Sequence, residues 1–295
     1  MLTLLGWSAL FSEGASASNP DIDGQRPVFA WPVYSDRSPS VLPIVSGGSW
    51  ESTLPLAHLQ DRRLSRPARS TNALGASTRF DIDLEAVRAV GVLALPKHNL
   101  STSATVTWLG SLTSNFSSLV FNTQPIDAWP AGTTPEDMAG INAAIVTVLP
   151  EDKSVRYLRC TISDVNNAAG YVELGRVIVA GAWRPSAFMT VGAKLGLESA
   201  SERIVSDGGA ALYLTKPMRR YWDFSLSLIE EAETFAQAWH MMRQLGSVGQ
   251  LFFVYAPSEA FLHERSFLCV MRDLSPVEFP FAHFRSVAFR LVEEL

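Results

Sequence analysis

The sequence predicts a mainly β protein, and three features of its residue pattern support that fold class. Short apolar runs alternate with polar residues at a period of two, which is the pattern of half-buried strands. Turn-forming Gly, Pro, Asn and Ser residues separate these runs. Only one segment, at about residues 230–245, shows the three-and-four spacing of a helix. We therefore expect β-sandwich or β-barrel domains with a single helix.

The length of 295 residues favours two modest domains, each large enough to fold around its own core. We place these domains at residues 50–184 and 185–295. Residues 1–49 are rich in Pro, Gly and Ser, which predicts an extended N-terminal arm that a neighbouring surface orders. This arm packs on the first domain or completes the second, and the sequence leaves both options open.

Alternating strands dominate the domain at residues 50–184. Phe80, Ile82 and Leu84 alternate with polar residues and predict a half-buried strand. The run Val87–Leu95 is apolar on both faces and predicts a central strand. Further strands are expected at 105–108, 156–162 and 171–179, with a long surface loop at 116–134. This succession is typical of a jelly-roll β-sandwich.

The domain at residues 185–295 combines strands with the predicted helix. One strand face is expected to hold Trp222, Phe224, Leu226 and Leu228. The apolar stripe of the helix comprises Ala232, Phe235, Trp239, Met242 and Leu245. Its first turn carries Glu230, Glu231 and Glu233, and Gly246 ends it. Strands follow at 250–255, 266–273 and 286–293, the last with Val287, Phe289 and Leu291 on one face.

Charge and hydropathy exclude two classes of partner. The net charge is -5, and the densest basic stretch, Arg62, Arg63, Arg66 and Arg69, is broken by Pro67 and predicts a solvated loop. We therefore expect no nucleic-acid binding. No apolar run is long enough to span a membrane. Residues 1–17 resemble a secretory signal, but no Lys or Arg precedes the apolar run, so we expect no cleaved signal and no membrane insertion.

The sequence predicts no catalytic residue, no metal site and no cofactor. Cys160 and Cys269 are the only cysteines and are expected to be buried free thiols. No pair of the five histidines has metal-ligand spacing, and His240 is expected to have a packing or surface role. A Gly-x-Ser-x-Gly elbow, a phosphate-binding loop and a dinucleotide fingerprint are all absent from the sequence.

Three groups of residues remain as candidate sites. Lys97, His98 and Asn99 end an apolar strand, where sandwich folds place ligands, although Asn is also a common turn former. The carboxylates of Asp81 and Asp83 share one strand face, where they could hold a cation, act in acid–base chemistry or simply face solvent. The third group consists of Trp50, Trp129 and Trp183, which suit packing, sugar stacking or protein contacts.

Two segments resemble a known type of module. The segment "STRFDIDLEAVRAVGVLALPKHNLSTSATVTWLGS" (77–111) resembles the front half of discoidin-like, galactose-binding-type jelly rolls. The segment "VRYLRCTISDVNNAAGYVELGRVIVAG" (155–181) resembles their closing half. Many modules of that type bind sugars, so the resemblance implies a possible glycan ligand. Beyond Asp81 and Asp83, the sequence shows no acidic cluster of the kind that binds calcium.

The layout of residues 185–295 resembles the tail-tube-type domain of siphophage distal tail proteins. The resemblance lies in a strand, the helix "EEAETFAQAWHMMRQLG", a strand ending in "FFVYAPS" and a terminal strand closing with "VEEL". It implies a virion protein, made in the host cytoplasm, that forms a ring at the phage tail tip. In that family the ring is commonly a hexamer and links the tail tube protein to the baseplate hub protein.

These observations lead to one main hypothesis and two alternatives. The main hypothesis is a structural tail-tip protein without an active site, whose partners are other copies of itself, the tail tube and the hub. The first alternative is a module that binds a host surface glycan through Lys97, His98 and Asn99. The second is a hydrolase that uses Asp81, Asp83 or His98.

Overall fold

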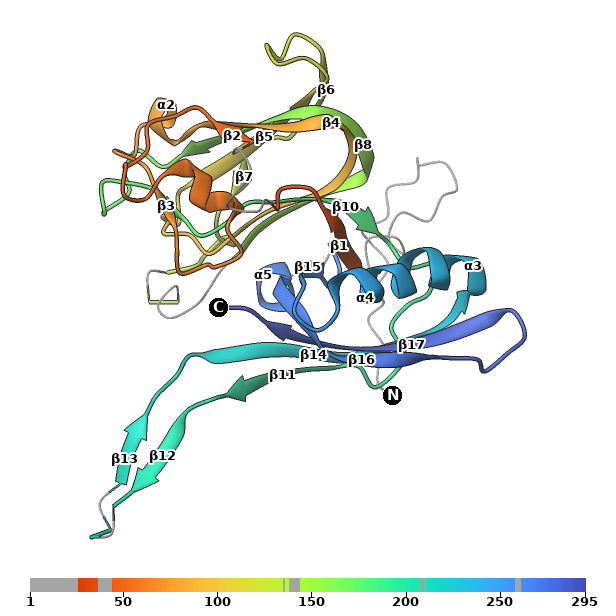
Figure 1. The fold of residues 1–295 in the computed structure, drawn as a ribbon. Helices are drawn as coiled ribbons and strands as arrows, with labels where there is room; N and C mark the ends of the chain where they lie inside the picture. Colours follow the sequence, from red (N-terminus) through yellow and green to blue (C-terminus); the bar gives the residue numbers. More distant parts are fainter. Residues whose placement is uncertain are drawn as a thin grey trace, which may run out of the picture.

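The computed structural model describes residues 26–36, 44–134, 136–137, 144–206, 208–209, 211–257 and 261–295. Its architecture is mainly β, as the sequence predicts (Figure 1). One antiparallel sheet runs through the molecule in the strand order β11-β14-β17-β16-β15-β1-β10-β4-β8-β5-β6. Its two ends curl into separate modules, each with its own apolar core. The predicted signal-like residues 1–17 lie outside the described residues.

The first module is a β-sandwich of jelly-roll type. Its elements are β2 (Val45–Ser46), η1 (Leu56–Gln60), β3 (Ala68–Arg69), α2 (Gly75–Thr78), β4 (Phe80–Pro96), β5 (Thr105–Ser111), β6 (Leu119–Asn122), β7 (Ile126–Asp127), β8 (Ala144–Ser163), β9 (Glu173–Leu174) and β10 (Ile178–Trp183). Phe80, Ile82 and Trp108 are buried in its core, as their alternation predicts. The predicted loop 116–134 is wrong in part, because β6 and β7 interrupt it and both pair with β5.

Strand β4 joins the two strands that the sequence predicts separately. Its ladder with β8 shifts register between Asp83 and Arg88 and again between Val90 and Val92. These irregularities turn the middle of β4 outward, so Val87 is 56% exposed. The predicted central strand Val87–Leu95 is therefore wrong at its start, and burial on both faces begins only at Val90.

The second module holds the C-terminal strands and the helix. Its elements are β11 (Lys194–Ser199), β12 (Glu202–Val205), β13 (Ala211–Leu214), β14 (Met218–Glu230), β15 (Gln250–Val254), α5 (Leu262–Arg265), β16 (Phe267–Glu278) and β17 (Phe284–Glu293). Trp222, Phe224 and Leu226 are buried together, as predicted. Leu228 is exposed instead, because a register shift after Leu226 places it in a left-handed conformation with φ 62°.

The helix covers residues 231–245, but the predicted apolar stripe is partly wrong. It consists of α3 (Glu231–Glu233), a π-helical segment η2 (Thr234–Trp239) and α4 (His240–Leu245). The residues buried against the core are Thr234, Ala238, Met241 and Met242, so the buried face keeps the three-and-four spacing but is rotated away from most of the predicted stripe. Phe235 and Trp239 are instead 40% and 45% exposed. Gly246 ends the helix with a positive φ, as expected. In the described part of the chain, no helix is long and apolar enough to cross a membrane.

Strand β1 (Val28–Val33) from the N-terminal region joins the two modules. It pairs antiparallel with β10 on one side and with β15 on the other. Phe29 and Trp31 face the core of the second module, whereas Val28 and Ala30 belong to a third apolar cluster at the junction. The N-terminal segment therefore contributes to both modules at once. The boundaries at 49/50 and 184/185 stay a prediction.

Candidate functional site

The candidate ligand loop Lys97–Asn99 directly follows β4 at one end of the sandwich. The Asn99 side chain has a structural role in this loop. Its amide nitrogen donates to the Tyr171 carbonyl at 3.1 Å, and its Oδ1 accepts from the Glu173 backbone N–H at 2.7 Å. Both amide ends are thus engaged in holding the 171–173 segment against the strand end. A ligand role for Asn99 stays a prediction.

The His98 ring is packed into the fold and is not exposed as a ligand-binding side chain would be. Its Nδ1 accepts from the Leu100 backbone N–H at 3.2 Å, and its ring lies 5.4 Å from the Trp129 ring, centroid to centroid. Burial lowers the pKa of His98 to about 4, and the Asp164 carboxylate opposes this shift only in part. The imidazole is therefore neutral at pH 7 and forms part of the packing around Trp129.

The surface beside the loop carries charged and aromatic groups. Lys97 has a left-handed conformation, with φ 61°, and its carbonyl accepts from the Gly175 N–H at 2.8 Å. Next to this turn, Arg69 donates twice to Glu173 Oε2, at 3.0 and 2.8 Å. The Arg69 guanidinium also lies 4.2 Å from the centroid of the Tyr171 ring. These groups are half-buried and lie together at this end of the sandwich.

The carboxylates of Asp81 and Asp83 are paired with arginines from the neighbouring strand. Arg159 donates two bonds to Asp81, both 2.7 Å long, and Arg156 donates to Asp83 at 2.9 and 3.1 Å. The bonds from Arg156 hold the pKa of Asp83 below its usual value. Both carboxylates are thus satisfied on the solvent side of β4. This geometry agrees with the structural interpretation of the pair and speaks against a cation or a general acid there.

The other predicted residues lie where packing requires them. Cys160 and Cys269 are buried free thiols, as predicted, and burial raises the pKa of both. Trp129 and Trp183 are buried, and His240 packs edge-on against Trp31 at 5.3 Å between ring centroids. Among the residues that the structure describes, no three His, Cys, Asp or Glu side chains gather as metal ligands.

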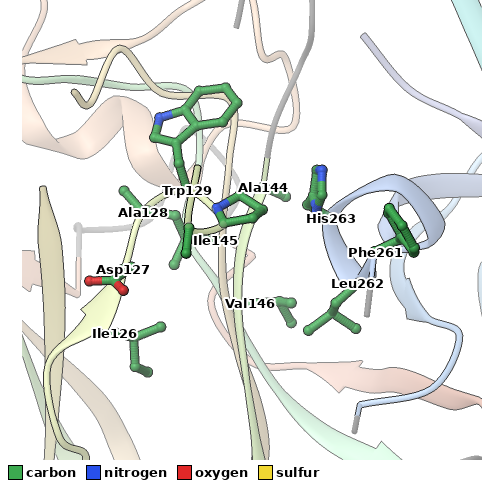
Figure 2. A pocket seen from close by; sticks show the side chains of 12 residues that line it. Ile126, Asp127, Ala128, Trp129, Ala144, Ile145, Val146, Phe261, Leu262 and His263 are labelled. Atoms are coloured by element: carbon green, nitrogen blue, oxygen red, sulfur yellow. The ribbon is translucent and has the colours of Figure 1, made fainter. Parts of the chain in front are cut away.

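A pocket of about 370 Å³ lies where the sandwich meets α5 (Figure 2). Its walls include Ile126, Trp129, Ile145 and Leu262, so they are mostly apolar. Asp127 and His263 are the titratable side chains among the described lining residues, and Figure 2 shows them on opposite sides. Because these two groups do not converge, the pocket offers no acid–base pair.

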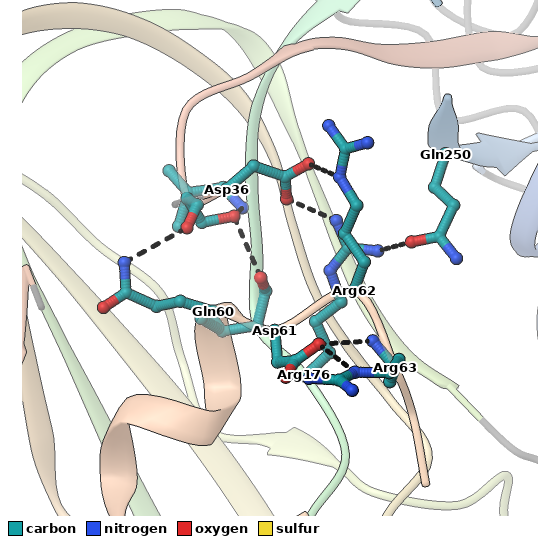
Figure 3. Close-up of polar contacts among 10 residues, drawn as sticks. Asp36, Gln60, Asp61, Arg62, Arg63, Arg176 and Gln250 are labelled. Carbon is teal, nitrogen blue, oxygen red and sulfur yellow. Dashed lines mark hydrogen bonds and ion pairs between the residues drawn. The ribbon is translucent and has the colours of Figure 1, made fainter. Parts of the chain in front are cut away.

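A buried polar network ties the two modules to the N-terminal segment (Figure 3). The fully buried Arg176 side chain, which precedes β10, donates to Asp36 after β1 and to Gln250 of β15. Arg62 adds a bond of 3.2 Å to the second oxygen of Asp36. The buried cation is therefore compensated by one carboxylate and one amide oxygen, each from a different part of the chain. We assign a structural role to this network.

A hairpin that projects from the second module carries many exposed apolar side chains. We call β12 and β13 the ribbon; it extends from β11 and β14 into solvent (Figure 1). All eight strand residues of the ribbon are exposed. The apolar members of this set are Ile204, Val205, Ala211, Leu212, Tyr213 and Leu214. Exposed aliphatic side chains at this density mark an interaction surface.

A second exposed apolar group lies at the opposite end of β14 and β17. We call the turn between β16 and β17, with Leu228 beside it, the aromatic tip (Figure 1). Its exposed side chains are Leu228, Phe279, Phe281 and Phe284. The helix begins next to this turn, where the Glu231 backbone N–H donates to the His283 carbonyl at 3.2 Å. On the helix that starts at this end, Phe235 and Trp239 are also exposed, and their rings lie 6.2 Å apart, centroid to centroid.

Sequence reasoning missed the ribbon and the tip as functional surfaces. The ribbon has a usable signal, since the apolar runs 204–205 and 211–214 flank the turn "SDGG". The tip has a weaker one, the three phenylalanines around Pro280. Neither signal tells whether the side chains are buried within the chain. That information came only from the fold.

Comparison with known proteins gives matches among solved structures alone. No protein-family model matches the chain, and no curated protein matches it. A family 32 carbohydrate-binding module of NanJ from Clostridium perfringens, in complex with galactose, is 12% identical with a TM-score of 0.35. That match covers 46% of this chain and 90% of that chain.

Two further matches are of the same kind. The lectin domain of lectinolysin, in complex with Lewis B antigen, is 14% identical with a TM-score of 0.37, covering 52% of this chain and 98% of that one. CBM32-1 from a family 31 glycoside hydrolase of Clostridium perfringens is 16% identical with a TM-score of 0.33, covering 46% and 89%. The ligands named here belong to those proteins. The resemblance to siphophage distal tail proteins stays a prediction.

Proposed function

We propose that this chain is a structural virion protein of a phage tail tip, where copies form a ring that joins the tail tube to the baseplate hub. The observation that carries the proposal is the ribbon, whose strand residues are all exposed. An isolated two-stranded hairpin is only marginally stable in water. A ribbon with apolar side chains on both faces therefore functions when it is covered by another protein surface.

The open edges of the long sheet support the same proposal. In the described sheet, β11 and β6 are the terminal strands. Leu195 and Leu197 of β11 are exposed beside an edge that has hydrogen-bonding capacity left. Edge strands of this kind pair readily with a strand of another subunit. The chain thus offers both main-chain and apolar side-chain means of assembly.

The first experiment measures the mass of the purified chain by light scattering, alone and mixed with tail tube and hub proteins. Negative-stain microscopy then visualises any assemblies. Under the proposal the chain forms rings or a stable co-complex, with a mass that is a multiple of 32.3 kDa or the sum of the partners. A persistent monomer that binds neither partner would overturn the proposal.

A surface feature of the sandwich favours a second function, the binding of a host surface glycan. The ion pair of Arg69 with Glu173, the Tyr171 ring and the Lys97 turn share one end of the sandwich. Sugars are held by aromatic rings together with a few charged or polar groups. This function is compatible with the first, because one module can assemble while the other binds.

The glycan function is tested with a glycan array on the intact protein. We expect Tyr171→Ala and Arg69→Ala to weaken binding by tenfold or more, whereas the control Phe188→Ala, at an exposed ring outside the ribbon and the sandwich, leaves it unchanged. His98 and Asn99 are left intact in this test, because their replacement would also loosen the fold. An array without hits would remove the glycan function.

A further inference from the structure

We propose that the ribbon of one copy packs on the aromatic tip of a second copy, so that subunits join head to tail. This inference rests on the proposed function, since it names the partner of the ribbon inside the assembly. Both surfaces belong to the second module and lie at opposite ends of strands β14 and β17 (Figure 1). Every copy therefore carries one donor surface and one acceptor surface.

The ribbon carries exposed apolar side chains on both faces. Its register pairs Ile204 with Leu212 on one face and Arg203 with Tyr213 on the other. Leu212 and Tyr213 are each 67% exposed. Burying several such side chains at about 25 cal/mol per Å² is the main source of free energy available for an association of this kind.

The base of the ribbon is fixed, which lowers the entropic cost of docking. Strands β11 and β14 pair over six registered positions from Lys194 to Ser199. The Ser201 hydroxyl donates to the Lys216 carbonyl at 3.2 Å and accepts from its N–H at 3.0 Å. The Arg220 guanidinium, just inside β14, pairs with the buried Glu293 carboxylate. The ribbon is thus held on the module before any partner arrives.

The aromatic tip is also preformed. The nearly buried Arg285 side chain donates to the carbonyls of Phe281 and Phe284, both at 2.9 Å. Its guanidinium lies 4.3 Å from the Phe279 ring centroid and pairs with Glu231 at 2.7 Å. One arginine therefore fixes the turn, positions a ring and connects the tip to the start of the helix. Such a rigid, apolar projection is suited to insertion against an aliphatic surface.

The two surfaces cannot meet within one chain. Strand β14 runs from Met218, at the base of the ribbon, to Glu230, at the tip. Its 13 residues rise about 3.3 Å each, which separates the two surfaces by roughly 40 Å. The ribbon points away from the tip (Figure 1). Contact between them therefore requires a second molecule.

Charge favours the pairing of ribbon with tip over pairing of like surfaces. Around the ribbon, Arg203 and Arg219 are exposed and take part in no ion pair within the described residues. Around the tip, the exposed Glu230 and Glu278 carboxylates are likewise outside every ion pair that the described residues form. Cationic and anionic rims attract each other and disfavour ribbon–ribbon contacts. A head-to-tail contact generates a ring when the rotation between neighbouring copies closes, which is the geometry that the proposed function requires.

Two variants of the full chain test the contact. The ribbon variant carries Ile204→Asp with Leu212→Asp, and the tip variant carries Phe279→Asp with Phe281→Asp. Leu74→Asp, at an exposed leucine of the sandwich, is the matched control. We expect light scattering to show the control assembled like the unmodified chain and each variant reduced to the 32.3 kDa monomer.

Mixing the two variants gives the decisive measurement. The ribbon variant keeps an intact tip and the tip variant keeps an intact ribbon, so an equimolar mixture forms one native contact. We expect a species of about twice the 32.3 kDa monomer mass and nothing larger. Circular dichroism checks that both variants are folded, and Ser replaces Asp at the same positions if one is not.

Several results would overturn the contact. Variants that stay monomeric after mixing, or a tip variant that still assembles alone, would show that ribbon and tip do not pair. If the unmodified chain is a monomer that binds tube or hub protein through the ribbon, the inference fails while the proposed function stands. A monomer that binds neither the tube protein nor the hub protein would overturn both the head-to-tail contact and the proposed function.

Discussion

Strand β1 and the ribbon have similar apolar sequences but opposite surroundings. In β1, Val28 and Phe29 are buried on opposite faces, and neighbouring strands occupy both edges. In the ribbon, Ile204 and Val205 also point to opposite faces, yet both are exposed. An apolar pattern on both faces therefore indicates that a strand will be covered. It does not tell whether the cover comes from the same chain.

The comparison also separates stability from assembly. Side chains of β1 hold the two modules together, so changes there should alter the free energy of unfolding. Side chains of the ribbon touch little of their own chain, so changes there should alter association instead. The predictions below test this division, beginning with the largest expected effect.

Phe29→Ala should reduce the free energy of unfolding by about 3–5 kcal/mol, because it leaves a cavity among aromatic rings. The Phe29 ring lies 4.7 Å from Trp183, 5.1 Å from Phe289 and 5.2 Å from Phe253, centroid to centroid. Denaturant unfolding measures the loss. Phe281→Ala at the exposed tip is the control and should cost far less. A loss below about 1 kcal/mol for Phe29→Ala would mean that β1 is not the junction between the modules.

Arg176→Met should cost about 3 kcal/mol, because it removes the buried partner of Asp36 and Gln250. Arg62 stays beside Asp36 and limits the loss. The control is Arg62→Met, at an arginine whose side chain is 57% exposed; it should cost less than about 1 kcal/mol. Equal effects of the two variants, measured by thermal unfolding, would contradict the assigned role of the buried network.

Acidification should destabilise the sandwich through His98. The pKa of His98 is about 4 in the fold because of burial, against about 6.5 in an unfolded chain. Above pH 6.5 the imidazole is neutral in both states, and between pH 6.5 and 4 mainly the unfolded state binds the proton. Stability is therefore lost as pH falls through this window, by about 3 kcal/mol in total. Denaturant unfolding of His98→Phe at several pH values should show a flatter profile in this window.

The smallest effect is expected in the ribbon. Val205→Ser and Tyr213→Ser should change the stability of the monomer by less than about 0.5 kcal/mol, because both side chains are exposed. A dilute sample below the association range isolates the monomer for this measurement. A loss above about 2 kcal/mol would show that the ribbon is packed on its own chain in solution, contrary to the structure.

The sequence predicts the mainly β fold, most strand faces and the single helix. Strand alternation at Phe80, Ile82 and Trp108 correctly gives the buried side, because burial follows directly from the period of two. The face of the helix could not be predicted, since apolar residues lie on both sides of it, Phe235 and Trp239 on the exposed side and Ala238 and Met241 on the buried side. The register shifts that expose Val87 and Leu228 depend on pairing with distant strands, which no local pattern encodes.

The candidate sites were predicted less well than the fold. The residue types at Lys97, His98 and Asn99 suggested a ligand site. They do not show that the Asn99 side-chain amide both donates a hydrogen bond to the 171–173 segment and accepts one from it. Asp81 and Asp83 could not be recognised as ion-paired, because Arg159 and Arg156 lie more than 70 residues away along the chain. Exposure of the ribbon and the tip depends on the whole fold, so it could not be predicted from the sequence.

The position of β1 has a consequence for the order of events during synthesis. Val28 leaves the ribosome before its partner Val254, which follows 226 residues later. Until Val254 has been made, one edge of β1 stays unpaired and can form hydrogen bonds with a wrong strand. Contacts of such large sequence separation also slow folding. The aromatic tip emerges later still, at residues 279–284, so head-to-tail association has to wait until the junction strands are already made.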